Sequence, residues 1–308
     1  MTAISRISLP GLGLCLWLLA ALAGCNQEAE PTLPQYGAAP VPEQPVYRFG
    51  IHPLHNPARL HEIFSPLIDY LNRQVDAAEF RFEASRNYAV YDEKLFAGEF
   101  AFSLPNPYQT VESLKHGYRV FGKMGDDEDF RGIILVRRDS GIDGFSDLRG
   151  KVVAYPAPSA LAATMLPQHF LHSHGIDVFH ELDNRYVGSQ ESAIMNVYLG
   201  EAAAGATWIP PWRTLSRERP ELSAALEVKW QTDNLPNNGL VVREDVPPAI
   251  AAEVGALLFD LHNHEEGRAI LARMGLSRFE PADNETYRPV REFIENFTRE
   301  LRDPREAR

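Results

Sequence analysis

Ser159 lies where the sequence could build an anion-binding site. It follows a β-rich segment, 151–155, and two prolines that end a strand, and it precedes a run of helix-forming residues, 160–166. A helix that begins there leaves backbone N–H groups without acceptors and carries a partial positive charge at its N-terminus, so it can hold an anion. The alternative is an ordinary βα unit in which the serine only caps its own helix.

Nucleophilic and metal chemistry find little support in the sequence. Ser159 has no base partner in the sequence pattern, and no paired-carboxylate, zinc or phosphate-loop motif is found. His52, His55 and His61 are close in sequence, but their spacing supplies no third ligand together with carboxylates. The sequence therefore predicts no metal and no cofactor, and an enzyme is a less favoured alternative.

The segments that would position these residues alternate between strand and helix patterns. Strands are predicted at 47–51, 80–84, 99–104, 132–137, 151–155, 202–208 and 238–243. Helices are predicted at about 60–75, 88–97, from 105, 160–175, 190–199, 248–263 and 287–301. Such alternation predicts an α/β protein whose sheets are mostly parallel and flanked by helices.

The composition is that of an acidic globular protein. The chain has 308 residues, 44% of them hydrophobic, and a formal net charge of −12. It is long enough for two domains and unlike a basic nucleic-acid-binding surface, so no nucleic-acid partner is expected. An acidic chain can still bind an anion, because local amides and hydroxyls matter more than the total charge.

Residues 1–25 have the pattern of a bacterial lipoprotein signal peptide. An apolar run ends in Leu22-Ala23-Gly24-Cys25, which matches a lipobox with Cys25 as the lipid-carrying first residue of the mature protein. A plain secretory signal is the alternative. The only other cysteine, Cys15, lies inside the leader, so the mature chain would have no cysteine free for a disulfide, a zinc site or a thiol nucleophile.

Residues 26–46 are predicted to form a flexible tether, because they are rich in Pro, Glu and Gln and poor in large apolar residues. Lipid, tether and globular body together describe a periplasmic protein held at a membrane surface. Asn26 stands in place of the aspartate tied to inner-membrane retention, which favours the outer membrane.

Seven short motifs follow one another along residues 46–300. They are Phe49-Gly50-Ile51-His52-Pro53, Pro66-Leu67-Ile68-Asp69-Tyr70-Leu71, Asn87-Tyr88, Gly98-Glu99-Phe100-Ala101-Phe102 with Asn106-Pro107-Tyr108, Asp139-Ser140-Gly141-Ile142 with Asp147-Leu148-Arg149-Gly150-Lys151, Gly188-Ser189-Gln190-Glu191-Ser192-Ala193, and Leu235-Pro236-Asn237-Asn238-Gly239. In this order they resemble the PhnD-like phosphate, phosphite and phosphonate-binding proteins of ABC transporters.

The resemblance implies a type II periplasmic-binding-protein fold, with two α/β lobes, a ligand cleft between them and closure by a hinge. The lobes are expected at 46–132 plus 237–308 and at 133–236. The implied function is capture of a small oxyanion or phosphonate-like ligand by a monomer that hands it to an ABC permease. A sensory protein that presents its ligand-bound form to a membrane histidine kinase is the alternative.

The resemblance also implies which residues bind the ligand. They are His52, Tyr88, Asn106, Tyr108, Ser159, Ala160, Gln190 and Asn237. Tyr88 and Tyr108 could donate phenol O–H groups or pack as core, and Asn106 could instead cap its helix. Gln190 stands where the family has a histidine, and it could be a neutral donor or a surface residue in a first helical turn.

One segment departs from the family pattern. Ala160-Leu161-Ala162-Ala163 stands where the family has a Ser-Thr-Ser-Gly run whose hydroxyls and amides wrap a phosphonate. Each lost hydroxyl bond removes about 0.5–1.5 kcal/mol. The amides could still hold an anion, while Trp208 and Trp212 could line an apolar part of the pocket, which leaves room for an organic ligand.

Overall fold

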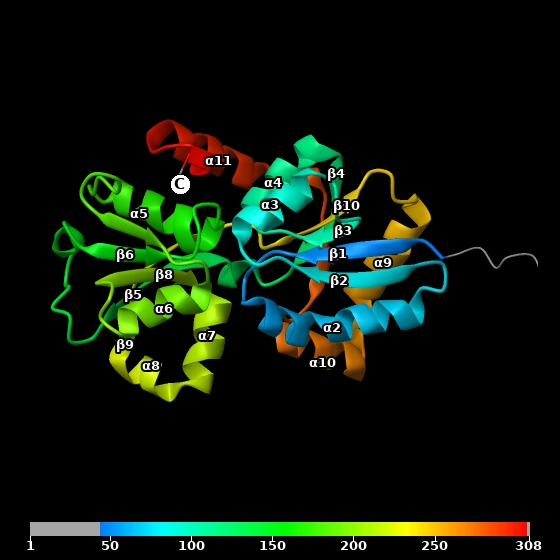
Figure 1. Cartoon of the computed structure of the whole chain (residues 1–308), viewed down its shortest axis with the longest axis horizontal. Coiled ribbons are helices and arrows are strands. Elements are labelled where there is room, and N and C mark those ends of the chain that lie inside the picture. Colours follow the sequence, from blue (N-terminus) through cyan, green and yellow to red (C-terminus); the bar gives the residue numbers. More distant parts are fainter. Residues whose placement is uncertain (1–43, 307–308) are drawn as a thin grey trace, which may run out of the picture. The chain divides into compact units, whose positions relative to one another are not determined.

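The computed structural model describes residues 44–306, which belong to one compact unit. Their strands form two sheets with helices packed against them (Figure 1). The strand order is β11-β4-β10-β3-β1-β2 in the six-stranded sheet and β7-β6-β8-β5-β9 in the five-stranded sheet. The predicted α/β fold is therefore confirmed. The predicted leader, Cys25 and nearly all of the predicted tether lie outside the described residues.

The first lobe is built on the six-stranded sheet. Its strands are β1 (Val46–Ile51), β2 (Glu79–Ala84), β3 (Phe102–Leu104), β4 (Tyr118–Met124), β10 (Gly239–Arg243) and β11 (Phe279–Pro281). Its helices are α2 (Pro57–Gln74), α3 (Tyr88–Phe96), α4 (Pro107–Ser113), α9 (Pro248–Asp260), α10 (Glu265–Met274) and α11 (Arg288–Glu300). Short 3₁₀ turns occupy Leu114–His116, Leu261–Asn263, Asn284–Tyr287 and Pro304–Glu306.

The second lobe is built on the five-stranded sheet. Its strands are β5 (Arg131–Arg137), β6 (Val152–Tyr155), β7 (Asp183–Tyr186), β8 (Ala204–Trp208) and β9 (Leu226–Asn234). Its helices are α5 (Leu166–Ser173), α6 (Gln190–Tyr198), α7 (Ile209–Glu218) and α8 (Pro220–Ala225), with a π-helical turn at Leu161–Met165 and a 3₁₀ turn at Phe145–Leu148. A further 3₁₀ turn, Asp127–Asp129, lies in the segment that joins the lobes.

The core of the first lobe follows from simple sequence patterns. Asn56 caps α2 by accepting from the amide of Arg59, and the apolar residues that recur at helical spacing along α2, such as Leu60, Leu67 and Leu71, are buried against the sheet. C-terminal helix α11 packs on α4 and also reaches the second lobe, where Glu300 bonds His169 at 3.1 Å (Figure 1).

The expectation of mostly parallel sheets is wrong, because both sheets are mixed. β1 pairs in parallel with β2 and β3, and β6 pairs in parallel with β7 and β8. The other pairings of the described strands are antiparallel. The reason is that residues 125–130 and 235–238 carry the chain from one sheet to the other. β5 and β10 therefore start at the facing edges of the sheets and run away from them, opposite to the strands beside them. The predicted lobe boundaries stay predictions.

The helix predicted from residue 160 begins in an unexpected way. Its first five residues form a π-helical turn, and α-helical geometry starts only at Leu166. Pro167 has no N–H to continue the α-helical ladder, which accounts for the wider turn before it. The turn packs directly on β5, where a Cβ atom on Gly132 would lie 2.5 Å from the carbonyl oxygen of Ala162. Glycine is therefore required at that position.

Candidate functional site

A small cavity lies between the facing edges of the two sheets, and the space in it that is open to a water-sized molecule is about 10 Å³. We call it the central cavity. It is lined by His52, Tyr88, Asn106, Phe130, Ala160, Leu161, Ala162, Ala163, Gln190, Trp208 and Asn238. Five of the eight predicted ligand-binding residues are in this set, and they come from both lobes.

The π-helical turn supplies backbone donors to the central cavity. The amides of Leu161, Ala162 and Ala163 have no hydrogen-bond acceptor in the described part of the chain. The first amide of the turn with a partner is that of Thr164, which donates to the carbonyl of Ala160 at 2.8 Å. Orphan amides at the start of a helical segment attract negative charge, and these three residues line the central cavity.

Gln190 and Tyr88 form the neighbouring wall. Gln190 is the first residue of α6 and is buried, and its Oε1 accepts from the Thr207 hydroxyl at 2.8 Å. The Tyr88 hydroxyl also bonds to Gln190, and burial raises the pKa of Tyr88, so the phenol stays protonated. The surface position considered for Gln190 is therefore wrong, because the residue lies inside, between α3 and β8.

Asn106 is the N-cap of α4, and it also lines the central cavity. Its Oδ1 accepts from the amide of Gln109 at 3.1 Å and its own amide donates to Gln109 Oε1, which is a capping box at the start of α4. Its Nδ2 donates to the carbonyl of Ser159 at 2.9 Å. Asn106 therefore joins the first lobe to the loop before the π-helical turn, and it also lines the central cavity.

His52 is a neutral acceptor in the same cavity. Its Nδ1 lies 2.8 Å from the carbonyl oxygen of Leu104, which can only accept, so Nδ1 carries the proton. Burial lowers the pKa of His52 to about 4, with a smaller contribution from His55, so the ring is uncharged at neutral pH. Its Nε2 atom then presents a lone pair, and no group in the described residues donates to it.

Three predicted residues lie outside the central cavity. Tyr108 and Ser159 line a neighbouring cavity on the other side of Tyr88, where the Ser159 hydroxyl donates to Asp92 at 3.3 Å. Asn237 lies in the returning segment between the lobes, and its Nδ2 donates to the carbonyl of Gly125 at 2.7 Å. From these positions beside the central cavity, the three residues are placed to support its walls.

The sequence analysis missed two lining residues, Phe130 and Asn238. Phe130 packs edge-on against Trp208, with ring centroids 5.3 Å apart. Asn238 is fully buried, and its Oδ1 atom has no hydrogen-bond partner among the described residues. Both belong to the two segments that cross between the lobes, and the Leu235–Gly239 motif was the signal that could have identified Asn238.

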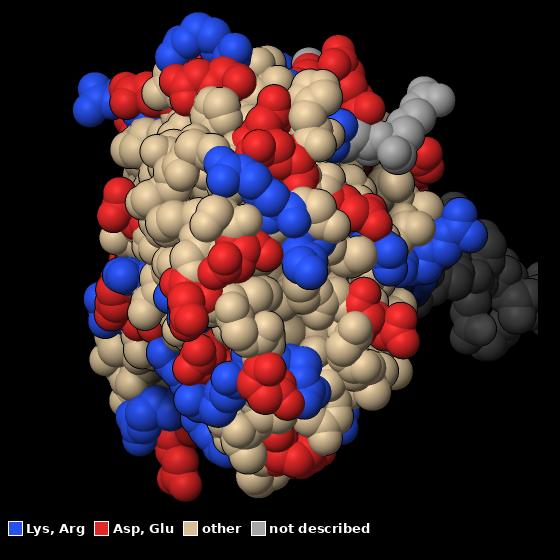
Figure 2. All heavy atoms as spheres, turned by 90° about the vertical axis from the view of Figure 1, so that its left-hand side faces the viewer, with Lys and Arg blue, Asp and Glu red and all other residues tan. Residues whose placement is uncertain are grey.

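No Lys, Arg, Asp or Glu side chain of residues 44–306 lines the central cavity. A bound anion would therefore meet amide, hydroxyl and indole groups rather than cations. Asp92 lines the neighbouring cavity, and burial raises the pKa of its carboxyl group to about 7. The outer surface differs, since acidic and basic side chains are interspersed over the face that the second lobe presents in Figure 2.

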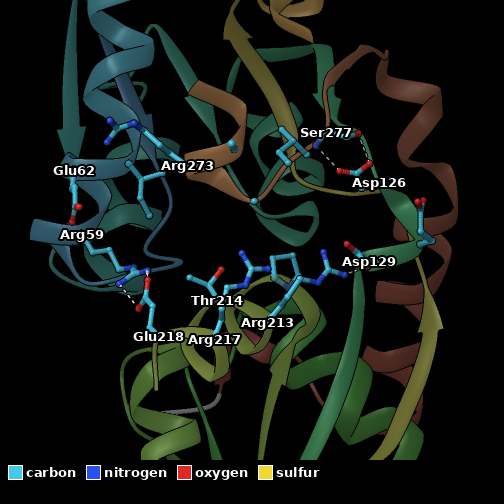
Figure 3. Close-up of a pocket in the computed structure, with 16 residues that line it drawn as sticks. Arg59, Glu62, Asp126, Asp129, Arg213, Thr214, Arg217, Glu218, Arg273 and Ser277 are labelled. Atoms are coloured by element: carbon cyan, nitrogen blue, oxygen red, sulfur yellow. Dashed lines mark hydrogen bonds and ion pairs between the residues drawn. The ribbon is translucent and has the colours of Figure 1, made fainter. Parts of the chain in front are cut away.

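Charged side chains gather instead at an open hollow beside the cavity (Figure 3). Arg59 on α2 and Glu218 on α7 reach toward each other across it, with a 2.5 Å ion pair. Nearby, His55 bonds Glu191 at 2.6 Å, and both partners are more buried. These contacts connect the first lobe to α6 and α7 of the second lobe.

Comparison with known proteins agrees with this arrangement. The model of the family described as ABC transporter, phosphonate, periplasmic substrate-binding protein matches residues 49–287. The chain belongs to this family. It is thus a periplasmic substrate-binding protein of the phosphonate ABC-transporter class, a transport component and not an enzyme family. The predicted resemblance is confirmed.

Solved structures show the same fold at low sequence identity. A binding protein component of an ABC phosphonate transporter from Pseudomonas aeruginosa has a TM-score of 0.77 and 17% identity, over 84% of this chain and 88% of that one. PhnD1 from Prochlorococcus marinus, in complex with methylphosphonate, has a TM-score of 0.76 and 18% identity, over 82% and 98%. The periplasmic aliphatic sulphonate-binding protein SsuA from Escherichia coli has a TM-score of 0.57 and 16% identity, over 84% and 90%.

Between residues 44 and 306, no helix combines the length and apolar character needed to cross a bilayer. The same residues contain no group of three or more His, Cys, Asp or Glu side chains arranged to hold a metal ion.

Proposed function

We propose that this substrate-binding protein captures a small phosphonate-like oxyanion in the central cavity and delivers it to an ABC permease. The observation that carries the proposal is the row of three orphan amides, Leu161 to Ala163, in a buried cavity without charged side chains. Backbone amides and neutral donors are sufficient to bind an anion when they converge on it from a helix start. His52, Tyr88, Asn106, Ala160 and Gln190 would complete the site.

Capture would proceed by closure of the two lobes. Two chain segments join the lobes, and the ligand would lie between walls contributed by each. The pairs His55–Glu191 and Arg59–Glu218 form across the lobes and would break on opening. A ligand that contacts both walls favours the closed state by its differential affinity, and the permease would recognise that state.

The site can be tested by placing a negative charge among the amides. An aspartate at Ala162 would repel a bound anion by about 4 kcal/mol at 4 Å and an effective dielectric constant near 20, a loss of about 1,000-fold in affinity. Ala252→Asp on the exposed face of α9 is the matched control. Ala162→Ser adds a hydroxyl beside the same amides and is expected to keep or strengthen binding.

The measurement is calorimetric titration of the full-length protein in detergent with methylphosphonate, phosphite and phosphate. Saturable binding by wild type and Ala252→Asp, lost in Ala162→Asp, would support the assignment. Failure of wild type to bind any of the three anions would refute the proposed ligand class. Equal binding by wild type and Ala162→Asp would show that the ligand lies elsewhere.

We further propose that the protein acts as a monomer anchored by lipid on Cys25, with the outer membrane as the favoured location. The lipobox pattern supports this anchor. Metabolic labelling with an alkyne fatty acid should mark wild type and Cys15→Ser but not Cys25→Ser. Label that persists in Cys25→Ser would overturn the assignment of the lipidated residue, and membrane fractionation of the labelled protein would identify the membrane.

A further inference from the structure

Two groups in the central cavity can only accept hydrogen bonds. Asn238 is fully buried, its Nδ2 lies 3.4 Å from the sulfur of Met124, and its Oδ1 atom has no partner in the described part of the chain. The Nδ1–H group of His52 donates to the carbonyl oxygen of Leu104, so the Nε2 atom of the neutral ring has a lone pair and can only accept. A buried acceptor without a donor costs free energy, and Asn238 Oδ1 is such an atom, so a donor placed beside it would be stabilising.

Other residues that line the cavity provide hydrogen-bond donors and therefore require an acceptor on the ligand. The amides of Leu161, Ala162 and Ala163 are hydrogen-bond donors without acceptors, so they favour a negatively charged oxygen. No cationic side chain in the described residues lines the cavity. A ligand that satisfies both sets must be an anion that also carries a donor of its own. A fully ionised oxyanion meets the amides but turns its lone pairs toward Asn238 Oδ1 and His52 Nε2, which repels it.

We propose that the central cavity binds its oxyanion in the protonated, singly charged form, and that Asn238 and His52 select this form by accepting a hydrogen bond from its P–OH group. This inference rests on the proposed function and names the ionic form and the specificity-determining residues of the same site. It predicts preference for acids that keep a proton near neutral pH, such as phosphonates, over sulfonates of the same shape and charge.

The decisive comparison uses methylphosphonate and methanesulfonate. Methylphosphonate monoanion and methanesulfonate have the same charge and nearly the same shape, and they differ in one O–H. A missing donor opposite a buried acceptor should weaken sulfonate binding roughly ten- to hundredfold. Calorimetric titration of the full-length protein at pH 6 would measure the ratio of the two dissociation constants.

The pH dependence provides a second, independent readout. The second proton of a phosphoryl-type group leaves near neutrality, at about pH 6 for a phosphate monoester. Above the second pKa of methylphosphonate itself, which is higher than that of the ester, the monoanion becomes scarcer, so the apparent affinity for methylphosphonate should fall by about tenfold per pH unit. Methanesulfonate has no proton to lose in this range, so its affinity reports only the groups of the protein.

That control is needed because protein groups near the site also titrate. The rings of Tyr88 and Tyr91 from α3 face His52 edge-on at 6.3 and 6.4 Å, but burial raises the pKa of both phenols, so neither ionises near neutral pH. His55 lies on the same loop as His52 and bonds Glu191 on α6. Asp92, farther along α3, has a pKa raised to about 7 by burial, and its ionisation would repel either anion. The charge on Asp92 acts on both ligands alike, so the ratio of their affinities reports only the effect of the proton that methylphosphonate carries.

Asn238→Leu tests the residue itself, because leucine keeps the volume and removes the acceptor. The preference for methylphosphonate should shrink toward unity in this variant, while sulfonate affinity stays level or rises. If the variant does not fold, the wild-type ratio and its pH slope still decide the question. Methylphosphonate that binds with no preference over methanesulfonate and no added pH slope would overturn the inference and leave the proposed function intact. Absence of binding by either anion would overturn both.

Discussion

Asp92 is a carboxyl group whose ionisation the fold opposes. It lies on α3, where its Oδ1 accepts from Gln109 Nε2 at 2.6 Å and its Oδ2 accepts from the Ser159 hydroxyl at 3.3 Å. These two bonds favour the carboxylate, but burial outweighs them and raises the pKa from 3.8 to about 7. Asp92→Asn should remove the penalty and keep both contacts, since the amide oxygen accepts from Gln109 and the amide nitrogen donates to Ser159.

The magnitude follows from linkage between protonation and folding. The unfolded chain releases this proton near pH 3.8, whereas the folded protein keeps it until about pH 7. Between these values the folded state binds more protons, so the free energy of unfolding falls as pH rises. Over about three pKa units at 1.36 kcal/mol each, the loss approaches about 4 kcal/mol above pH 7. Asn cannot ionise, so Asp92→Asn should match wild type near pH 4 and exceed it by up to that amount at pH 8.

Urea unfolding of the full-length protein at pH 4, 5.5, 7 and 8.5 would measure the difference. Asp69→Asn, which replaces an exposed carboxylate on α2, is the matched control and should follow wild type in parallel at every pH. Parallel curves for Asp92→Asn and wild type across the whole range would refute the argument, because they would mean that burial does not keep Asp92 protonated.

Three further substitutions have directional outcomes. A methyl group on Gly205 would lie 2.7 Å from a carbonyl oxygen of α6, so Gly205→Ala should lower the free energy of unfolding in urea by about 1–3 kcal/mol. Asn106→Ala removes a helix cap and the bond between the lobes, and should cost about 1–2 kcal/mol in the same assay. Glu191→Gln weakens the bond to His55, so methylphosphonate affinity should fall several-fold and the unliganded protein should expand in small-angle scattering.

Each of these has a contrary result. An unchanged unfolding curve for Gly205→Ala would mean that α6 does not pack on β8 as closely as described. Wild-type stability in Asn106→Ala would mean that neither of its bonds contributes. Unchanged affinity and unchanged scattering in Glu191→Gln would show that its contact with His55 has no part in closure.

The candidate site was partly predictable because some of its parts are local. The helix starts near residues 107, 160 and 190 can be recognised from capping residues and prolines, while the resemblance to the binding-protein family marked Asn106 and Gln190 as candidate ligand-binding residues. The role of Asn238 was not predictable, because the residues next to it in the sequence do not indicate that its side-chain oxygen is buried without a donor. The same holds for the tautomer of His52, which is fixed by the carbonyl of Leu104, 52 residues away, while burial keeps the ring neutral.

Local pattern alone determined the α/β class and the order of motifs that marks the family, because periodicity and turn residues act over a few positions. Tertiary structure decided the mixed pairing of the sheets, the π-helical turn over Gly132, and the division of the candidate residues between the central cavity and its neighbours. It also placed residues of the first lobe, of the returning segment and of the π-helical turn around the same cavity. These features depend on contacts between segments far apart in the chain, which no short stretch of sequence specifies by itself.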